Sequence, residues 1–408
     1  MKYFRFTGAH RVLSVCSLFF ICFRALAFSE LHSISTLTFD KEGRLFVGDG
    51  DRPRVYSIDM RNEPDAPGKP FNLKGIDQKV ARFLGVSSSV LRITDMVVHP
   101  KSKKAFLAVT VGSGIKGIAY LIQVDSAGHL LNVIPEAGKI SVVDLDHNSG
   151  EDYHFWDRYP ASSLSITHIE AHKGNLYITG LRSGEFASTL YKVPFPFNGT
   201  VEKAQVSYYH AVHDQIESRA PVISHKVVTL KGKDYLLAVY TCTPLVLVPL
   251  TDIKDGANIR GKIIAELGYD NSPSDMLHFN LDRGEGLQSY ILINNRNRSA
   301  SLLKISDITD AAAKPGISTP SGFAKAGVSA QTIPLAGVLH MDMLNSQWLL
   351  TLRRNIDSGQ LDLITVMQGA WLRLSDFISE YNFPDYRYTG SQLEKKKFHD
   401  ILKDSEGF

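Results

Sequence analysis

Short hydrophobic runs alternate with polar or glycine turns along most of the chain, and a similar phrase opens six of these runs. Successive copies lie roughly 50 to 75 residues apart, a little more than the period of simple propeller repeats. Five of them place Asp or His where the run begins. The six copies are Ser35-Thr36-Leu37-Thr38-Phe39, Thr94-Asp95-Met96-Val97-Val98, Thr167-His168-Ile169-Glu170-Ala171, Ser224-His225-Lys226-Val227-Val228, Ser274-Asp275-Met276-Leu277-His278 and Leu339-His340-Met341-Asp342-Met343.

Further apolar runs rich in aromatic and β-branched residues follow each phrase, as at 105–109, 235–239 and 290–293. Antiparallel strands at regular spacing, with almost no helical periodicity, predict an all-β protein built by radial repetition of four-stranded sheets. The expectation is a β-propeller of six blades, with first strands near residues 34, 93, 166, 223, 273 and 338. A seventh blade could lie in 61–92 or 126–163, and a two-sheet sandwich is the simpler alternative fold.

Residues 37–49 read Leu-Thr-Phe-Asp-Lys-Glu-Gly-Arg-Leu-Phe-Val-Gly-Asp. This stretch resembles the first blade of propellers related to the NHL-repeat and SMP-30/gluconolactonase groups. The resemblance covers about 25 residues and implies a propeller fold with lactone hydrolysis as one activity. No motif in the sequence matches the acidic calcium ligands typical of SMP-30-like lactonases.

The N-terminus has the composition of a secretory signal peptide over residues 1–27. Lys2, Arg5 and Arg11 precede an apolar stretch at 12–23, and Ala25-Leu26-Ala27 supplies small residues for cleavage. That stretch is too short to span a bilayer comfortably, and no later segment is apolar enough to do so. We therefore expect a secreted or periplasmic protein. The propeller would occupy 28–374, followed by a tail at 375–408 with a short amphipathic helix.

Charge and cysteine content restrict the function further. The full chain has a formal net charge of +3, and removal of a signal with only basic charges brings it close to neutral. A nucleic-acid-binding surface is therefore not expected. Cys242 is the one cysteine beyond the signal, so stability must come from packing and strand pairing rather than an internal disulfide.

First strands of propeller blades line the central channel, so the Asp and His residues of the phrases should converge there. Imidazole and carboxylate groups from several blades suit a divalent metal such as Zn, Mn, Fe or Ca. In that hypothesis His168, His225 and His340 are also the candidate catalytic residues. Alternatively, the acids organise turns and the histidines bridge waters. The predicted ligands are Asp95, His168, His225, Asp275 and His340.

Loops after the second strands should share the mouth of the channel with this ring. They carry Arg182, Arg296, Arg353 and Asn294, and arginine binds carboxylate or phosphate through paired hydrogen bonds. The sequence thus predicts an exported propeller that binds a small anionic molecule, as a metal-dependent hydrolase of lactones or esters or as a lyase. The competing hypothesis is a non-catalytic scaffold whose insertions at 126–163 and 198–222 bind a protein partner.

Two further motifs have weaker metal-binding patterns. The acidic stretch 144–152 resembles a calcium loop, but its glycine is displaced and Phe155 stands where an EF-hand has glutamate. His210 and His213 have helical i, i+3 spacing without the Glu-x-x of a zincin motif, which favours an ordinary surface segment.

Overall fold

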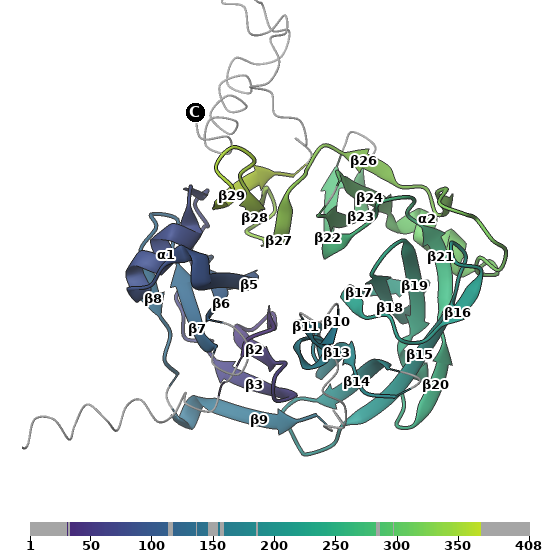
Figure 1. The fold of residues 1–408 in the computed structure, drawn as a ribbon, viewed down its shortest axis with the longest axis horizontal. Coiled ribbons are helices and arrows are strands. Elements are labelled where there is room, and N and C mark those ends of the chain that lie inside the picture. The colour runs from purple at the N-terminus through teal and green to yellow at the C-terminus, as the bar shows by residue number, and fades with distance from the viewer. Residues whose placement is uncertain are drawn as a thin grey trace, which may run out of the picture.

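The computed structural model describes residues 31, 33–112, 117–135, 137–145, 154–155, 159–184, 187–282, 286–296 and 298–368. Six antiparallel sheets stand around a central channel as the blades of a propeller (Figure 1). The predicted signal peptide and the predicted C-terminal helix lie outside the described residues. Within those residues, no helix combines the length and hydrophobicity needed to cross a membrane.

Blades 1, 2 and 6 each contain four strands, numbered below from the channel outward. Blade 1 consists of β1 (Thr36–Phe39), β2 (Arg44–Asp49), β3 (Arg54–Asp59) and β9 (Ile140–Asp144). Blade 2 consists of β5 (Leu91–Val98), β6 (Ala105–Val111), β7 (Ile118–Val124) and β8 (Leu130–Asn132). Blade 6 consists of β27 (Val338–Met343), β28 (Trp348–Arg354), β29 (Leu361–Met367) and β4 (Asn72–Leu73).

Blades 3, 4 and 5 follow the same plan, and blades 3 and 4 have additional strands at their outer edges. Blade 3 consists of β12 (His168–His172), β13 (Asn175–Leu181), β14 (Ser188–Pro194) and β15 (Glu202–His210), extended by β16 (Gln215–Glu217) and β20 (Ala257–Arg260). Blade 4 consists of β17 (Val222–Leu230), β18 (Lys233–Tyr240), β19 (Pro244–Pro249), β21 (Lys262–Glu266) and β25 (Ala326–Gly327). Blade 5 consists of β22 (Pro273–Asp282), β23 (Leu287–Asn295), β24 (Ala300–Lys304) and β26 (Gln331–Ile333).

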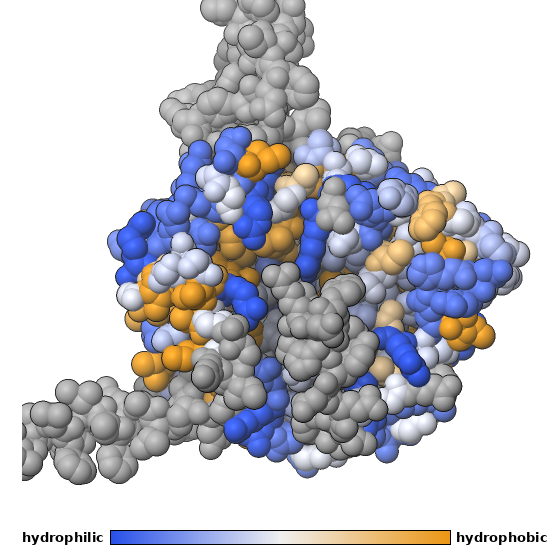
Figure 2. All heavy atoms as spheres, in the orientation of Figure 1, coloured by the Kyte–Doolittle hydropathy of each residue, from blue (hydrophilic) through white to orange (hydrophobic). Residues whose placement is uncertain are grey.

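Short elements connect the blades. They are the α-helices α1 (Ile76–Leu84) and α2 (Ile305–Ala312), the hairpin of β10 (His154–Phe155) and β11 (Tyr159–Pro160), and the 3₁₀ turns η1 (Ser88–Val90), η3 (Ala137–Lys139), η4 (Ala161–Leu164) and η5 (Leu250–Asp252). Figure 2 shows hydrophobic side chains gathering over α1 and β8 on one face, where Phe83 and Leu131 are exposed.

The blades do not follow one another around the ring in sequence order. The inner strand β1 contacts β5 on one side and β12 on the other, so blade 1 lies between blades 2 and 3. Strand β4 leaves blade 1 to complete blade 6, where Leu73 pairs with Leu363. Strand β9 returns after blade 2 to complete blade 1. The two segments considered for a seventh blade thus supply outer strands, helix and connections to a six-bladed ring.

The repeated phrase coincides with an irregularity in the first strands. In β5, β17, β22 and β27 the pairing with the second strand skips one residue. Such a bulge re-aims the side chains that follow it, and bulges are frequent beside functional sites. The skipped residues are Ile223, Thr94, Ser274 and Leu339.

Hydrophobic residues fill the spaces between neighbouring blades. Phe46 of blade 1 packs with Ile166 and Ile178 at blade 3, while Leu37 packs with Phe106 of blade 2. These contacts bury the apolar faces of both neighbouring sheets, which is the main driving force for this arrangement. The packing therefore fixes the unusual position of blade 1.

Candidate functional site

The first strands surround a cavity of about 320 Å³ at the centre of the ring. Four of the five predicted ring residues line it, namely Asp95, His168, Asp275 and His340. The fifth, His225, is fully buried and is not among the lining residues. Its ring packs edge-on against His168 with centroids 4.5 Å apart, and its Nδ1 lies 3.3 Å from Thr179 Oγ1.

The carboxylates of Asp95 and Asp342 join neighbouring blades. Asp95 Oδ2 accepts the backbone N–H of Leu37 in blade 1 at 2.7 Å, and its Oδ1 accepts that of Met96. Asp342 Oδ2 accepts the N–H of Val98 in blade 2, also at 2.7 Å. Hydrogen bonds between a carboxylate and backbone N–H groups are among the stronger ones. These acids therefore hold the inner wall of the channel together.

Asp275 and Glu170 form the same kind of connection at other blade boundaries. Asp275 Oδ2 accepts the N–H of Met341 in blade 6 at 2.9 Å, while its Oδ1 accepts from Met276 and from the Ser224 hydroxyl. Glu170 Oε2 accepts the N–H of Val227 in blade 4 at 2.7 Å. Four carboxylates from four blades thus accept hydrogen bonds that join neighbouring blades.

Burial perturbs the protonation of these acids. It raises the pKa of Asp275 to about 6, and the charge of Asp95 adds to this. The pKa values of Glu170 and Asp342 are also raised, chiefly because burial disfavours their charged forms. Several like charges therefore share one poorly solvated space.

Lys226 is a cation that the predicted ring did not include. It lines the same cavity from β17. Burial alone would lower the pKa of Lys226, but the carboxylates around it, led by Glu170 and Asp275, raise it. The ammonium is therefore charged at neutral pH, and it makes no hydrogen bond to any described residue.

The histidines of the channel differ in charge. Burial and the neighbouring His225 hold the pKa of His168 well below its ordinary value, and burial lowers that of His225 to about 3. Burial also acts on His340, but Asp95, whose Oδ1 lies 3.1 Å from His340 Nδ1, raises the pKa of His340 instead. His168 and His225 are thus neutral imidazoles, whereas the carboxylate of Asp95 shifts His340 in the opposite direction.

The predicted arginine rim is only partly at the cavity. Arg296 is exposed and lines it. Arg353 donates from Nε to the Ala336 carbonyl, and neither Arg353 nor Arg182 is among the lining residues. Asn294 is buried beside the channel wall, opposite Asp275 in the β22–β23 pairing, and its amide has no partner among the described residues.

Sequence reasoning missed Lys226, Asp342 and Glu170. Glu170 and Asp342 lie two residues beyond the cavity-lining His168 and His340, and alternate residues of a strand face the same side. Lys226 directly follows His225 in β17. All three residues stand inside the repeated phrases, so a reading of every polar position in each phrase identifies them.

The ring does not bring a compact set of metal ligands together. In the part of the chain that the structure describes, only His210, His213 and Glu217 place three ligand atoms within 4.8 Å of one another. Residues 146–152 of the predicted calcium loop lie outside the described residues. Within the predicted ring, His340 and Asp95 form an ion-pair contact, and the rings of His168 and His225 pack together.

Comparison with known proteins finds likeness in solved structures but not in sequence. No family model matches the sequence, and no curated protein sequence matches it either. Hydrazine synthase of Kuenenia stuttgartiensis is similar over 83% of this chain and 97% of that chain, at 12% identity and a TM-score of 0.35. The match to extracellular domains 1-2 of Drosophila Semaphorin 1a covers 83% of this chain and 87% of that chain, at 8% identity and a TM-score of 0.37. The match to the Plexin A4 extracellular region covers 83% of this chain and 46% of that chain, at 8% identity and a TM-score of 0.38. Likeness at this level concerns the arrangement of strands and carries no argument about ligand or activity.

Proposed function

We propose that this protein is an exported β-propeller that binds a small anionic molecule, such as a carboxylate, at the mouth of its central channel. Export rests on the signal-like N-terminal sequence. Ligand binding rests on one observation, namely that the channel's acceptors are used by the fold while cationic donors remain available. The cavity volume of about 320 Å³ falls within the range of small-molecule sites.

The donors face the cavity from three blades. Among the described residues, the side chains of Lys226 and Arg296 have no hydrogen-bond partner, and the His340 ring uses only Nδ1, in its contact with Asp95. By contrast, both oxygens of Asp95 and of Asp275 accept backbone N–H groups. A ligand rich in acceptor oxygens would give these donors hydrogen-bond partners. Glu170 and Asp275 already balance part of the positive charge of Lys226, so an added carboxylate would chiefly pair with Arg296.

A metal-dependent hydrolase or lyase at the ring stays a prediction. Neutral imidazoles such as His168 suit metal ligation, but the ligand atoms of the described ring residues are dispersed. The scaffold hypothesis likewise stays open, because parts of the 126–163 insertion lie outside the described residues. We therefore propose ligand binding without assigning a reaction.

Calorimetric titration of the purified protein with succinate, D-glucuronate and inorganic phosphate tests the proposal. Arg296→Gln and Lys226→Gln should weaken binding of the best probe by about tenfold or more, which corresponds to about 1.4 kcal/mol. The matched control is Arg354→Gln, because Arg354 is exposed, donates to the Gly359 carbonyl and does not line the cavity. Putrescine serves as a cationic counter-probe. Tighter binding of putrescine than of every anion, or wild-type affinity in Arg296→Gln, would contradict the proposal.

A further inference from the structure

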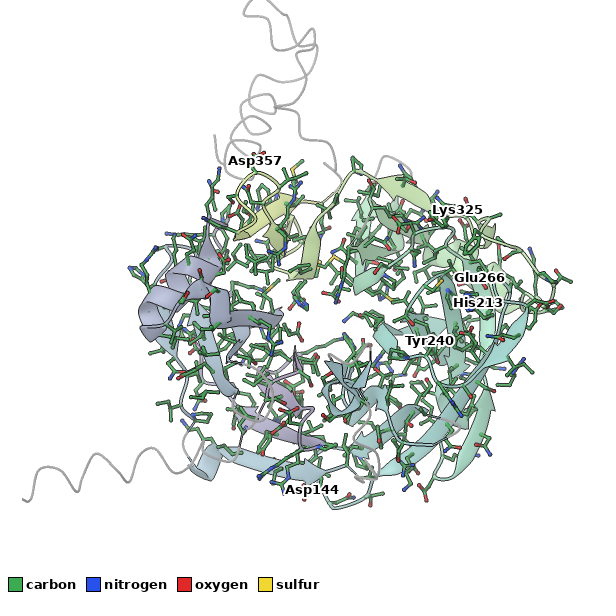
Figure 3. The ribbon with its side chains drawn as sticks, in the orientation of Figure 1. Asp144, His213, Tyr240, Glu266, Lys325 and Asp357 are labelled. Carbon is green, nitrogen blue, oxygen red and sulfur yellow. The ribbon has the colours of Figure 1, made fainter. Side chains whose placement is uncertain are left out.

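A second histidine–carboxylate cluster lies at the outer edge of blade 3, away from the channel. Strand β15 ends at His210, a turn follows, and β16 ends at Glu217. The hairpin pairs His210 with Gln215 and Tyr208 with Glu217. His213 lies in the turn, and Figure 3 shows it close to Glu266 on the side of blades 3 and 4. None of these residues lines the channel cavity.

Two imidazoles converge on one carboxylate oxygen. His213 Nδ1 lies 2.6 Å from Glu217 Oε1, and His210 Nδ1 lies 3.0 Å from the same atom. The two rings have centroids 4.2 Å apart, and the ligand atoms of all three residues lie within 4.8 Å of one another. In a tetrahedral zinc site with bonds of about 2.1 Å, ligand atoms are about 3.4 Å apart. Small side-chain movements would therefore admit an ion.

The His210 Nδ1 atom supplies independent support. His210 is 1% exposed, and although Nδ1 is near Glu217 it satisfies no hydrogen bond within the described residues. An unsatisfied buried polar atom is rare and calls for a partner. A metal ion between the three side chains would be that partner.

Residues behind the cluster hold His210 in the orientation that a metal ligand needs. His210 Nε2 lies 3.0 Å from Thr243 Oγ1, and the Thr243 hydroxyl donates to the buried carboxylate of Glu266. Glu266 is itself fixed by the backbone N–H of Ala211 at 3.0 Å. A histidine whose outer ring nitrogen is held by a polar chain presents the other nitrogen to a metal.

Glu217 is equally prepared. The Tyr208 hydroxyl donates to its Oε2 at 3.1 Å, while its Oε1 faces the two histidines and accepts from Gln215 Nε2 at 3.3 Å.

We propose that His210, His213 and Glu217 bind a single divalent transition-metal ion of the zinc class. Two imidazoles and one carboxylate select Zn²⁺ over Ca²⁺ or Mg²⁺, which prefer oxygen ligands. Three protein ligands leave a fourth coordination position for water or a small ligand. The half-exposed His213 places that position near solvent.

Titration of the tag-free full chain with Zn²⁺ by calorimetry and with Co²⁺ by visible absorption tests this site. The wild type should bind one ion per chain and give the intense absorption of tetrahedral Co²⁺. His213→Gln and Glu217→Gln should each raise the dissociation constant by about 100-fold or more and abolish that spectrum. His129→Gln is the matched control, because His129 and Asp125 form an exposed i, i+4 pair at 2.8 Å like that of His213 and Glu217.

Thr243→Val tests the positioning role of Thr243. It should keep a tetrahedral Co²⁺ spectrum with shifted bands and weaken zinc binding by about 10- to 100-fold. Circular dichroism shows whether each variant is folded. Absence of saturable binding in the wild type, or wild-type affinity in the folded His213→Gln and Glu217→Gln variants, would overturn the proposal.

Discussion

The channel and the outer edge of blade 3 both bring histidine next to carboxylate, but their carboxylates have different partners. In the channel, Asp95 and Asp275 accept backbone N–H groups from the neighbouring blade. At the outer edge, Glu217 receives only side-chain donors, from Tyr208, His213 and Gln215. Residue type is the same in the two places, while the bonding partners differ.

This difference separates structural from binding roles. Backbone donors cannot leave an acid without disturbing a strand, so the channel acids serve the fold. Side-chain donors can rotate away, so Glu217 can exchange its hydrogen bonds for a metal. The comparison predicts that loss of a channel acid mainly reduces stability, whereas loss of Glu217 mainly reduces ion binding.

The largest effect should come from Asp275→Ala. It leaves the buried N–H groups of Met276 and Met341 without acceptors, and we expect a loss of about 3 kcal/mol in the free energy of unfolding. Urea denaturation measures it. Asp357→Ala, in an exposed turn (Figure 3), is the control and should change stability by less than about 0.5 kcal/mol. Equal changes in the free energy of unfolding in the two variants would contradict the structural role of Asp275.

Zinc should stabilise the wild type through the outer cluster. At a free concentration 100 times the dissociation constant, binding adds about 2.7 kcal/mol to the free energy of unfolding. Glu217→Gln should lose this gain while remaining folded without metal. Thermal denaturation with zinc and with EDTA measures the gain. Persistence of the gain in Glu217→Gln would place the ion elsewhere.

Stability should depend on pH through Asp275. Its pKa is raised to about 6 in the folded protein, so the folded state binds the proton more tightly than the unfolded state. Its contribution is full below pH 4 and is lost as pH rises through 6. Relative to Asp275→Asn, the wild type should lose on the order of 2 kcal/mol over that range. A difference between the two proteins that stays constant with pH would contradict this.

The smallest effect on stability belongs to Arg296→Gln. The side chain is exposed and makes no hydrogen bond to a described residue, so we expect a change below about 0.5 kcal/mol. Its loss of anion binding should be seen at unchanged melting temperature. A large drop in melting temperature would move Arg296 to a structural role.

The sequence was sufficient to predict the propeller and the first strands of all six blades. Predicted starts near 93, 223 and 338 compare with Leu91, Val222 and Val338 in the structure. Local alternation and turn residues determine where a strand begins. They do not determine which blades are neighbours in the ring, so the sequence pattern does not predict that blade 1 lies between blades 2 and 3.

A one-residue irregularity explains why His225 is not in the channel. Aligned by phrase, Ser224-His225 corresponds to Thr94-Asp95, but the bulge of β17 falls at Ile223 and that of β5 at Thr94. A shift of one residue turns a side chain to the opposite face of a strand. Ser224 therefore takes the place of Asp95 after the bulge, and His225 faces blade 3, where it contacts His168 and Thr179.

The sequence signal of the outer cluster is a hairpin spacing rather than a helical one. A helical metal motif includes His210 and His213 only, whereas Glu217 lies beyond them on the return strand of the hairpin. A strand–turn–strand arrangement brings residues 210, 213 and 217 together without helical periodicity. Testing hairpin spacings as well as helical ones would have identified the site.

The closure of blade 6 by β4 has a consequence for the order of events during synthesis. Phe71, next to β4, is hydrogen-bonded to Thr365, which lies 294 positions later in the chain. At about 5 to 20 residues per second a ribosome needs roughly 15 to 60 s to make that stretch. Over this time β4 has no partner and the nascent ring cannot close.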